Sequence, residues 1–314
     1  MADSAKDVLY HYCSLDTFFN IMKNRSIWLS DVSKSNDAQE LSWITRQLKS
    51  SLSCYFFKFY DRIREKGLLE QLNDPEYKEI IGGLDNLDLS KTLKCWAFCL
   101  SEKEDNLGQW RGYADDGQGL AIGFKREFFA SKPGNTELLD IDKSYGIFDC
   151  VKYGDLDVIK EFLGDDEIKE VETTLDFKVL IRLFKTALAK TILLDPLYKN
   201  LSFQEEAEWR LACVVPTSKI LLNNFNPADN EHWLSSMSGI LRTKHYSFSP
   251  QNQTLVSHIE LQIENMKSAI ASVTIGPKSK LTILDVKLFL VSLGLIENYN
   301  DESIAVIQSK ASYR

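Results

Sequence analysis

The chain has 314 residues, of which 44% are hydrophobic and 26% are charged, and its formal net charge is −8. A chain of this length and composition can bury a full hydrophobic core. The negative charge argues against broad electrostatic attachment to nucleic acid or to an anionic membrane surface. Because no apolar run reaches the roughly 18 residues that span a bilayer, and "MADSAKDVLYHY" lacks signal-peptide features, we expect a cytoplasmic protein with no membrane partner.

The N-terminal part of the chain predicts a strand, a helix and a second strand. "VLYHYC" alternates between polar and apolar residues as a strand does, and Ser14 is placed to cap a helix with one apolar face. "SIWLSD" then predicts the second strand. Residues 36–72 carry apolar side chains at spacings of three and four, which predicts one long helix or two helices joined near "SSLS".

Strands and helices follow without a regular alternation in the rest of the chain. We expect strands at "KCWAFCLS", "LAIGF", "FDCVKYG", "EWRLACVV", "IELQI" and "SVTIGP". We expect helices within "NLGQWRGYADDGQG", over residues 155–195 and at "TILDVKLFLVSLG". No linker or repeat separates domains. The pattern predicts a single α+β domain over residues 1–314, with a mixed or antiparallel sheet, flanking helices, and helical insertions at about 36–72 and 155–195.

Cysteine and histidine spacing gives little support for a metal site. The closest of the six cysteines, Cys95 and Cys99, have the wrong spacing for a zinc or redox pair, and the four histidines lie far apart. The chain also lacks a dinucleotide-binding glycine fingerprint and a serine nucleophile elbow. We therefore expect reduced thiols and no metal cofactor.

Six stretches, in this order, resemble a bacterial family known as domain of unknown function 2971. They are "LYHYCSLDTFFNIMKNRSIWLS", "SNDAQE", "CLSEKEDNLGQWRGYADDGQGLAIGF", "EEAEWRL", "TIGPKS" and "IQSKASYR", and together they cover nearly the whole chain. The first of these stretches is also similar to the beginning of the ADP-ribosyltransferase superfamily. That second resemblance implies a split-sheet core with a long helical insertion, and nicotinamide adenine dinucleotide (NAD) as substrate.

In that superfamily, residues from three strands surround the dinucleotide. The resemblance assigns His11 to the first position, Ser101 or Tyr113 to the second, and Glu208 to the third. It implies that Glu208 stabilises the oxocarbenium-like state that forms when the glycosidic bond breaks. Neutral His11 would then hold a ribose hydroxyl.

Other nearby residues could complete such a site. In an alternating strand, Glu206, Glu208 and Arg210 share one face, so Glu206 could act on an acceptor and Arg210 could pair with a carboxylate or a pyrophosphate. The ring of Tyr113 or Trp110 could cover the nicotinamide. Two further candidates for substrate binding stand elsewhere: Arg111, a possible phosphate contact, and Asn36, which follows the second strand.

Each of these residues also has a purely structural interpretation, and two other functions remain open. "EAEWR" could be an ion-paired strand start, and Trp110 and Tyr113 could pack three residues apart in the core. A hydrolase or nuclease could use Glu206, Glu208 and Asp37 as ligands of a divalent cation. A sensor module could bind a nucleotide or a protein without chemistry. The leading hypothesis is a transferase or NAD-cleaving enzyme of a bacterial toxin or phage-defence system, with its acceptor and oligomeric state open.

Overall fold

The computed structural model describes residues 7–35, 41–73, 75, 78, 93–129, 145–217, 241–251 and 253–313. Asn36 and Asp37, two of the residues considered for a site, lie outside the described residues, as does most of the variable stretch 217–256. None of the helices within these ranges is long and apolar enough to cross a bilayer.

The described residues form an α+β fold around a 10-stranded mixed sheet. Its strands are β1 (Val8–Cys13), β2 (Ser26–Asp31), β3 (Leu93–Ser101), β4 (Leu120–Lys125), β5 (Tyr145–Cys150), β8 (Glu208–Pro216), β9 (Leu241–Gln251), β10 (Thr254–Ile263), β11 (Ile270–Ile275) and β12 (Ala305–Gln308). The order is β12-β11-β4-β1-β3-β2-β10-β9, with β8 between β3 and β5. β11 and β12 are parallel, whereas the other described pairs of this sheet are antiparallel.

The sheet splits where β1 and β2 both meet β3. β8 pairs with the whole length of β3, from Leu93 to Ser101. On the opposite edge of β3, β2 pairs at Trp96 and Ala97, and β1 pairs at Ser101. Among the described strands, none pairs with the edge of β3 between these two contacts, and β1 and β2 diverge from it.

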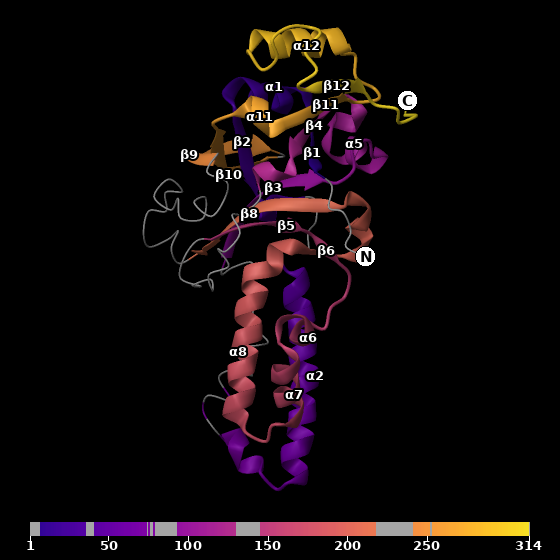
Figure 1. Ribbon diagram of the computed structural model, residues 1–314. Coiled ribbons are helices and arrows are strands. Elements are labelled where there is room, and N and C mark those ends of the chain that lie inside the picture. The colour runs from indigo at the N-terminus through magenta and orange to yellow at the C-terminus, as the bar shows by residue number, and fades with distance from the viewer. Residues whose placement is uncertain are drawn as a thin grey trace.

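Helices cover the sheet on both faces. α1 (Leu15–Asn24) begins at Ser14, whose side chain accepts a hydrogen bond from the Thr17 backbone, and it buries Phe18 and Met22 in the main core. α11 (Met266–Ala269) and α12 (Ile283–Ser292) contribute to the same core, and α12 lies beyond α1 at the top of Figure 1. The short helix α5 (Leu107–Tyr113) packs Trp110 against Tyr12 in a separate cluster.

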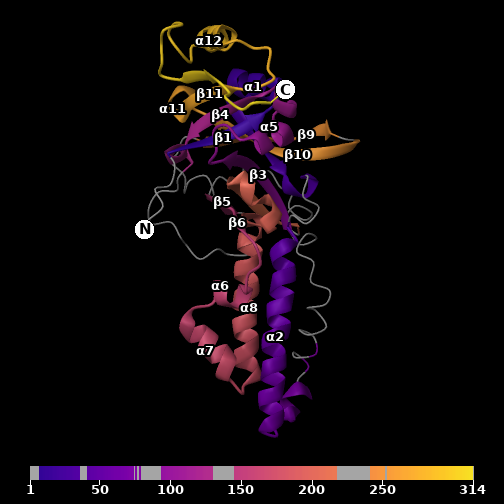
Figure 2. The same cartoon turned by 90° about the vertical axis from the view of Figure 1, so that its right-hand side faces the viewer.

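Four helices project away from the sheet as one bundle, which we call the helical arm (Figures 1 and 2). They are α2 (Trp43–Glu65), α6 (Val158–Phe162), α7 (Asp165–Thr173) and α8 (Phe177–Leu194), and they enclose an apolar core of their own. The apolar period of residues 36–72 predicted either one helix or two, and the described part contains one helix followed by the short turn η2 (Leu69–Asn73). α8 leads through η5 (Asp195–Leu197) into β7 (Tyr198–Lys199), which pairs with β6 (Lys152–Tyr153).

The α+β class is confirmed by these elements. The helices of the arm lie within the stretches 36–72 and 155–195. β12, β7 and β9 were not predicted, because β12 and β7 have too few residues to show a period and β9 lies in the variable stretch.

Candidate functional site

A cavity of about 300 Å³ lies at the split of the sheet. Its walls come from β1, β2, β3, α5, the start of β8 and the segment around Lys199. Five of the residues predicted for a site line it, including His11, Tyr113, Glu206 and Glu208. The fifth is Arg210. The split therefore brings together side chains that are nearly two hundred positions apart in the sequence.

His11 lies at the gap in the β3 edge. Its Nδ1 atom is 2.9 Å from the carbonyl oxygen of Cys99, one of the β3 residues between the contacts with β1 and β2. Because a carbonyl only accepts hydrogen bonds, Nδ1 donates, and the Nε2 atom of the neutral ring is left as an acceptor. The ring stacks on Phe98 with centroids 4.2 Å apart. Burial lowers the pKa of His11 to about 4, although the Cys99 carbonyl opposes this shift, so the ring is neutral at pH 7.

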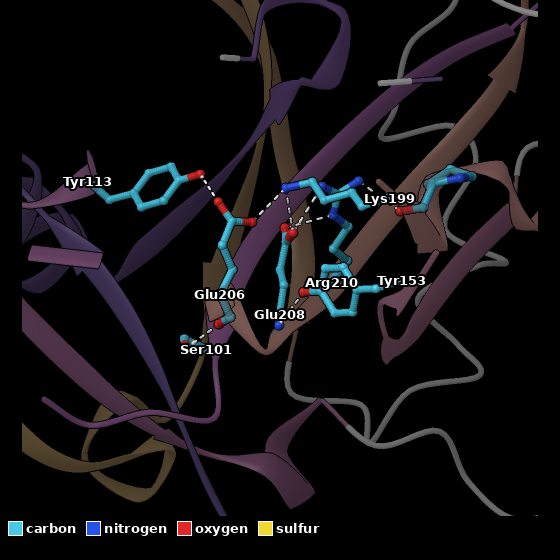
Figure 3. A network of polar contacts seen from close by, with 8 residues as sticks. Ser101, Tyr113, Tyr153, Lys199, Glu206, Glu208 and Arg210 are labelled. Atoms are coloured by element: carbon cyan, nitrogen blue, oxygen red, sulfur yellow. Dashed lines mark hydrogen bonds and ion pairs between the residues drawn. The ribbon is translucent and has the colours of Figure 1, made fainter. Parts of the chain in front are cut away.

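The centre of the site is an ionic cluster of Glu206, Lys199, Glu208 and Arg210 (Figure 3). The Lys199 ammonium lies between the carboxylates, with Nζ 2.8 Å from Glu206 Oε2 and 2.7 Å from Glu208 Oε2. Arg210 donates to both oxygens of Glu208, from Nε at 2.7 Å and from Nη2 at 3.1 Å. The two positive and two negative charges balance, which is the condition under which charges can be buried at tolerable cost.

Tyr113 completes this network from the other side of the cavity. Its hydroxyl donates to Glu206 Oε1 at 2.7 Å, so Glu206 lies between a phenol and an ammonium (Figure 3). Burial raises the pKa of Tyr113, and the negative charge of Glu206 raises it further, so the phenol stays protonated. Burial acts to raise the pKa of Glu208 as well, but the charges of Arg210 and Lys199 outweigh it and hold that pKa below its usual range. Glu208 is ionised throughout the physiological pH range.

The two carboxylates reach the cluster by different routes, and the prediction that they alternate along one strand is wrong. β8 begins at Glu208, whereas Glu206 ends the 3₁₀ helix η6 (Leu201–Glu206). The intervening Ala207 has a left-handed backbone, with φ 43° and ψ 55°. Ser101 Oγ donates to the Glu206 carbonyl at 2.6 Å and holds this turn. Glu206 therefore reaches Lys199 through a turn, not through strand alternation.

Of the other predicted site residues that the structure describes, Trp110, Ser101 and Arg111 do not line the cavity. Trp110 is fully buried against Tyr12, and its Nε1 donates to Asp105 at 2.6 Å. Ser101 is buried beside the η6 turn, where it serves the backbone. Arg111 is exposed. Arg210 lines the cavity, but its guanidinium is held by Glu208 and by the Pro196 carbonyl, whose oxygen lies 2.8 Å from Nη1.

Lys199 and Gln109 are among the cavity-wall residues that the sequence reasoning missed. Lys199 is only 5% exposed, and nothing in its local sequence distinguishes a lysine buried between two carboxylates from a surface lysine. Gln109 also lines the cavity, four residues before Tyr113 on α5. That helical spacing places both side chains on one face and could have identified Gln109 from the sequence.

A second hollow of about 470 Å³ adjoins the first. The two hollows share His11, Tyr12, Ser30 and Tyr113, and the second extends past Thr17 on α1. Both volumes lie within the range of roughly 300–1,000 Å³ that is typical of small-molecule sites.

The arrangement is unfavourable for the divalent-cation alternative. In the part of the chain that the structure describes, no group of three or more His, Cys, Asp or Glu side chains is placed to hold a metal ion. Lys199 occupies the position between Glu206 and Glu208 that a bridging cation would take. The third ligand of that hypothesis, Asp37, lies outside the described residues.

Comparisons with known proteins bear on one segment of the chain. Comparison with curated proteins and with solved structures yields no match. The sequence model of a family described as "Protein of unknown function (DUF2971)" matches residues 109–211. That segment begins at Gln109 and includes Tyr113 and the complete ionic cluster. The predicted similarity to this family is thus supported for the segment that supplies most of the charged cavity wall.

Proposed function

We propose that the cavity binds NAD and that the protein cleaves the bond between nicotinamide and ribose, with water or another molecule accepting the ADP-ribose. One observation carries this proposal: His11, Tyr113, Glu206 and Glu208, which belong to separate segments, line a single cavity at the split of the sheet. Cleavage of an N-glycosidic bond needs a negative charge beside the ribose and a polar hold on its hydroxyls. Carboxylates and a neutral histidine are suited to these two tasks.

The two carboxylates have different parts in this proposal. The Glu206 side chain is 12% exposed and the Glu208 side chain 6%, so Glu206 is the one that reaches the ligand. The C1′–N bond breaks, its electron pair goes to the nicotinamide nitrogen, and the oxygen of the acceptor bonds to C1′ while its proton passes to Glu206. Glu208 adds negative charge behind the ribose and holds Lys199 and Arg210 in position. His11 Nε2 accepts a hydrogen bond from a ribose hydroxyl, and the Tyr113 ring covers the nicotinamide.

Nicotinamide release by the purified protein tests this function. Chromatography would follow the free nicotinamide formed from NAD by the wild type and by Glu206→Gln. We expect the substitution to lower the rate by roughly 10²–10⁴-fold, the usual effect of losing a positioned acid or base. Glu127→Gln, an exposed carboxylate on η4 (Arg126–Phe128), is the matched control and should cleave at the wild-type rate. A wild type that releases no nicotinamide, or an unaffected Glu206→Gln, would refute the cleavage reaction.

A nucleotide-binding sensor without chemistry is the second candidate, and one observation favours it. Both oxygens of Glu206 and both oxygens of Glu208 already accept hydrogen bonds from neighbouring side chains. Calorimetric binding of NAD with no release of nicotinamide would select this function over the enzyme.

The biological setting that we propose is a cytoplasmic bacterial toxin or phage-defence system, in which depletion of NAD or modification of a protein or nucleic acid arrests the cell. Expression of the wild type and of Glu206→Gln in bacteria, with growth and NAD content as readouts, tests this setting. Equal growth and equal NAD content in both cultures would argue against it.

A further inference from the structure

Gln109 is a largely buried residue in the cavity wall, and its carboxamide has no hydrogen-bond partner among the described residues. The residue is 8% exposed and lines the first cavity. Its backbone N–H donates to Asn106 Oδ1 at 3.1 Å and so belongs to the helix cap. Its carboxamide, in contrast, makes no hydrogen bond to any residue in the described ranges. Gln109 is not one of the described residues with a fully buried, unpartnered polar atom, so its carboxamide is open to the cavity and can hydrogen-bond a ligand there.

Next to Gln109, which can both donate and accept, the phenols of this wall already have hydrogen-bond partners. Tyr12 donates its hydroxyl to the Lys103 carbonyl at 2.6 Å and accepts from the Asn106 backbone. Tyr113 is bound to Glu206, and Tyr10 is hydrogen-bonded to Ser272. The three phenols therefore present mainly their rings to the cavity, and flat rings favour a flat ligand group. Beside them, the amide offers one N–H donor next to one carbonyl acceptor.

We infer that Gln109 determines specificity by pairing with a planar edge on which an amino group lies beside an acceptor. NAD carries this chemistry twice, on the carboxamide of its nicotinamide and on its adenine, and glutamine is well matched to an adenine edge. The inference rests on the proposed nucleotide site and names the ligand group that the α5 side of this site recognises. Gln109 is a binding residue here, since it touches the ligand away from the bond that breaks.

Two pairs of small compounds show whether Gln109 recognises the nicotinamide end or the adenine end of NAD. Nicotinamide is compared with 3-acetylpyridine, and adenosine with purine riboside. In each pair the second compound lacks the amino group and keeps the shape. For one of the two pairs, we expect the wild type to bind the amino-bearing compound roughly 10-fold more tightly, in calorimetry or in ligand-observed magnetic resonance. The pair that shows the preference identifies which end of the dinucleotide lies against α5.

Three variants test whether Gln109 is the cause of that preference. Gln109→Met keeps the length of the side chain and removes both hydrogen bonds, so the two members of the pair should bind equally. Gln109→Glu keeps an acceptor for the amino group and repels the ligand's own acceptor, so it should weaken both members while keeping the preference. Gln118→Met, an exposed glutamine in the turn after α5, is the matched control and should behave as the wild type. Thermal unfolding of each variant shows that it is folded.

The result overturns the inference if the wild type shows no preference in either pair, if none of the four compounds binds, or if Gln109→Met keeps the wild-type preference. The same is true if Gln109→Met weakens both members of a pair equally, because that would indicate a structural role. The proposed cleavage fails separately: a Gln109-dependent preference without nicotinamide release supports the inference and rejects the enzyme. Nicotinamide release together with an unchanged preference in Gln109→Met supports the enzyme and rejects the role of Gln109.

Discussion

The two faces of the β3–β8 strand pair are built from the same backbone and have opposite chemistry at the end beside the cavity, whereas both faces are apolar at the other end. On one face, Trp96, Phe98 and Leu211 are buried in the main apolar core. On the other face, the cross-strand neighbours Cys99 and Arg210 stand beside the neighbours Ser101 and Glu208. The apolar face is sufficient to hold the two strands together, whereas buried ion pairs add little stability compared with apolar residues of similar volume. We therefore attribute the charged face to the cavity and not to the requirements of folding.

Removing one partner from the charged face should have the largest effect. Arg210→Ala leaves the buried Glu208 without its bidentate partner, and we expect the free energy of unfolding to fall by about 3–5 kcal/mol in denaturant titrations. The double variant Glu208→Met/Arg210→Met removes both charges and should recover most of this loss. If the double variant is as unstable as Arg210→Ala, the charged residues are needed for folding. Our attribution of these residues to the cavity would then be wrong.

Truncating a side chain on the apolar face should lower stability without affecting the cavity. Leu211→Ala opens a space in the main core, and we expect a loss of about 3 kcal/mol in the free energy of unfolding. Because Leu211 points away from the cavity, NAD binding by the folded variant should stay at the wild-type level. Weakened NAD binding measured by calorimetry well below the unfolding temperature would show that the two faces are not independent.

His11, at the gap between β1 and β2, should give the smallest effect, and this effect depends on pH. Its pKa is about 4 in the folded protein, below the value of 6.5 expected of an unfolded chain, so the unfolded state binds more protons in this range. Stability should therefore fall as the pH is lowered from about 6.5 towards 4, by up to about 2 kcal/mol at pH 5.

Urea titrations at pH 7 and pH 5 measure this effect, and the substitution His11→Gln isolates it. In this variant the difference between the two pH values should shrink. Part of the difference should remain, because burial also lowers the pKa of His258. An unchanged difference would mean that His11 is not buried as neutral imidazole.

The sequence was sufficient for the elements with a long period or a clear cap. The spacing of Ile44, Leu48 and Leu52 predicted α2, and Ser14 marked the start of α1. The sequence could not predict the split itself, because the divergence of β1 and β2 depends on which strands share an edge of β3. Strand pairing of this kind is a tertiary property that no local pattern encodes.

The candidate site was also predicted only in part, because the contacts between its residues depend on tertiary structure. The family resemblance drew attention to His11, Tyr113 and Glu208, and the fold brings these three to one cavity. Lys199 escaped notice because its partners are set by the left-handed turn at Ala207 and by the course of the chain after α8. Because of the same turn, Glu206 lines the cavity with Glu208 as predicted but does not lie on the same strand.

The helical arm has a structural consequence, because both of its ends join the cavity wall. Val32 and Lys34, in η1 (Val32–Lys34) ahead of α2, line the cavity, and so does Lys199, which follows α8. With 23 residues in α2, the arm extends about 35 Å from the sheet. The segment that anchors α8 to the sheet also supplies the ammonium between Glu206 and Glu208. The arm and the cavity share a foundation, so a substitution at the base of the arm is also a substitution in the cavity wall.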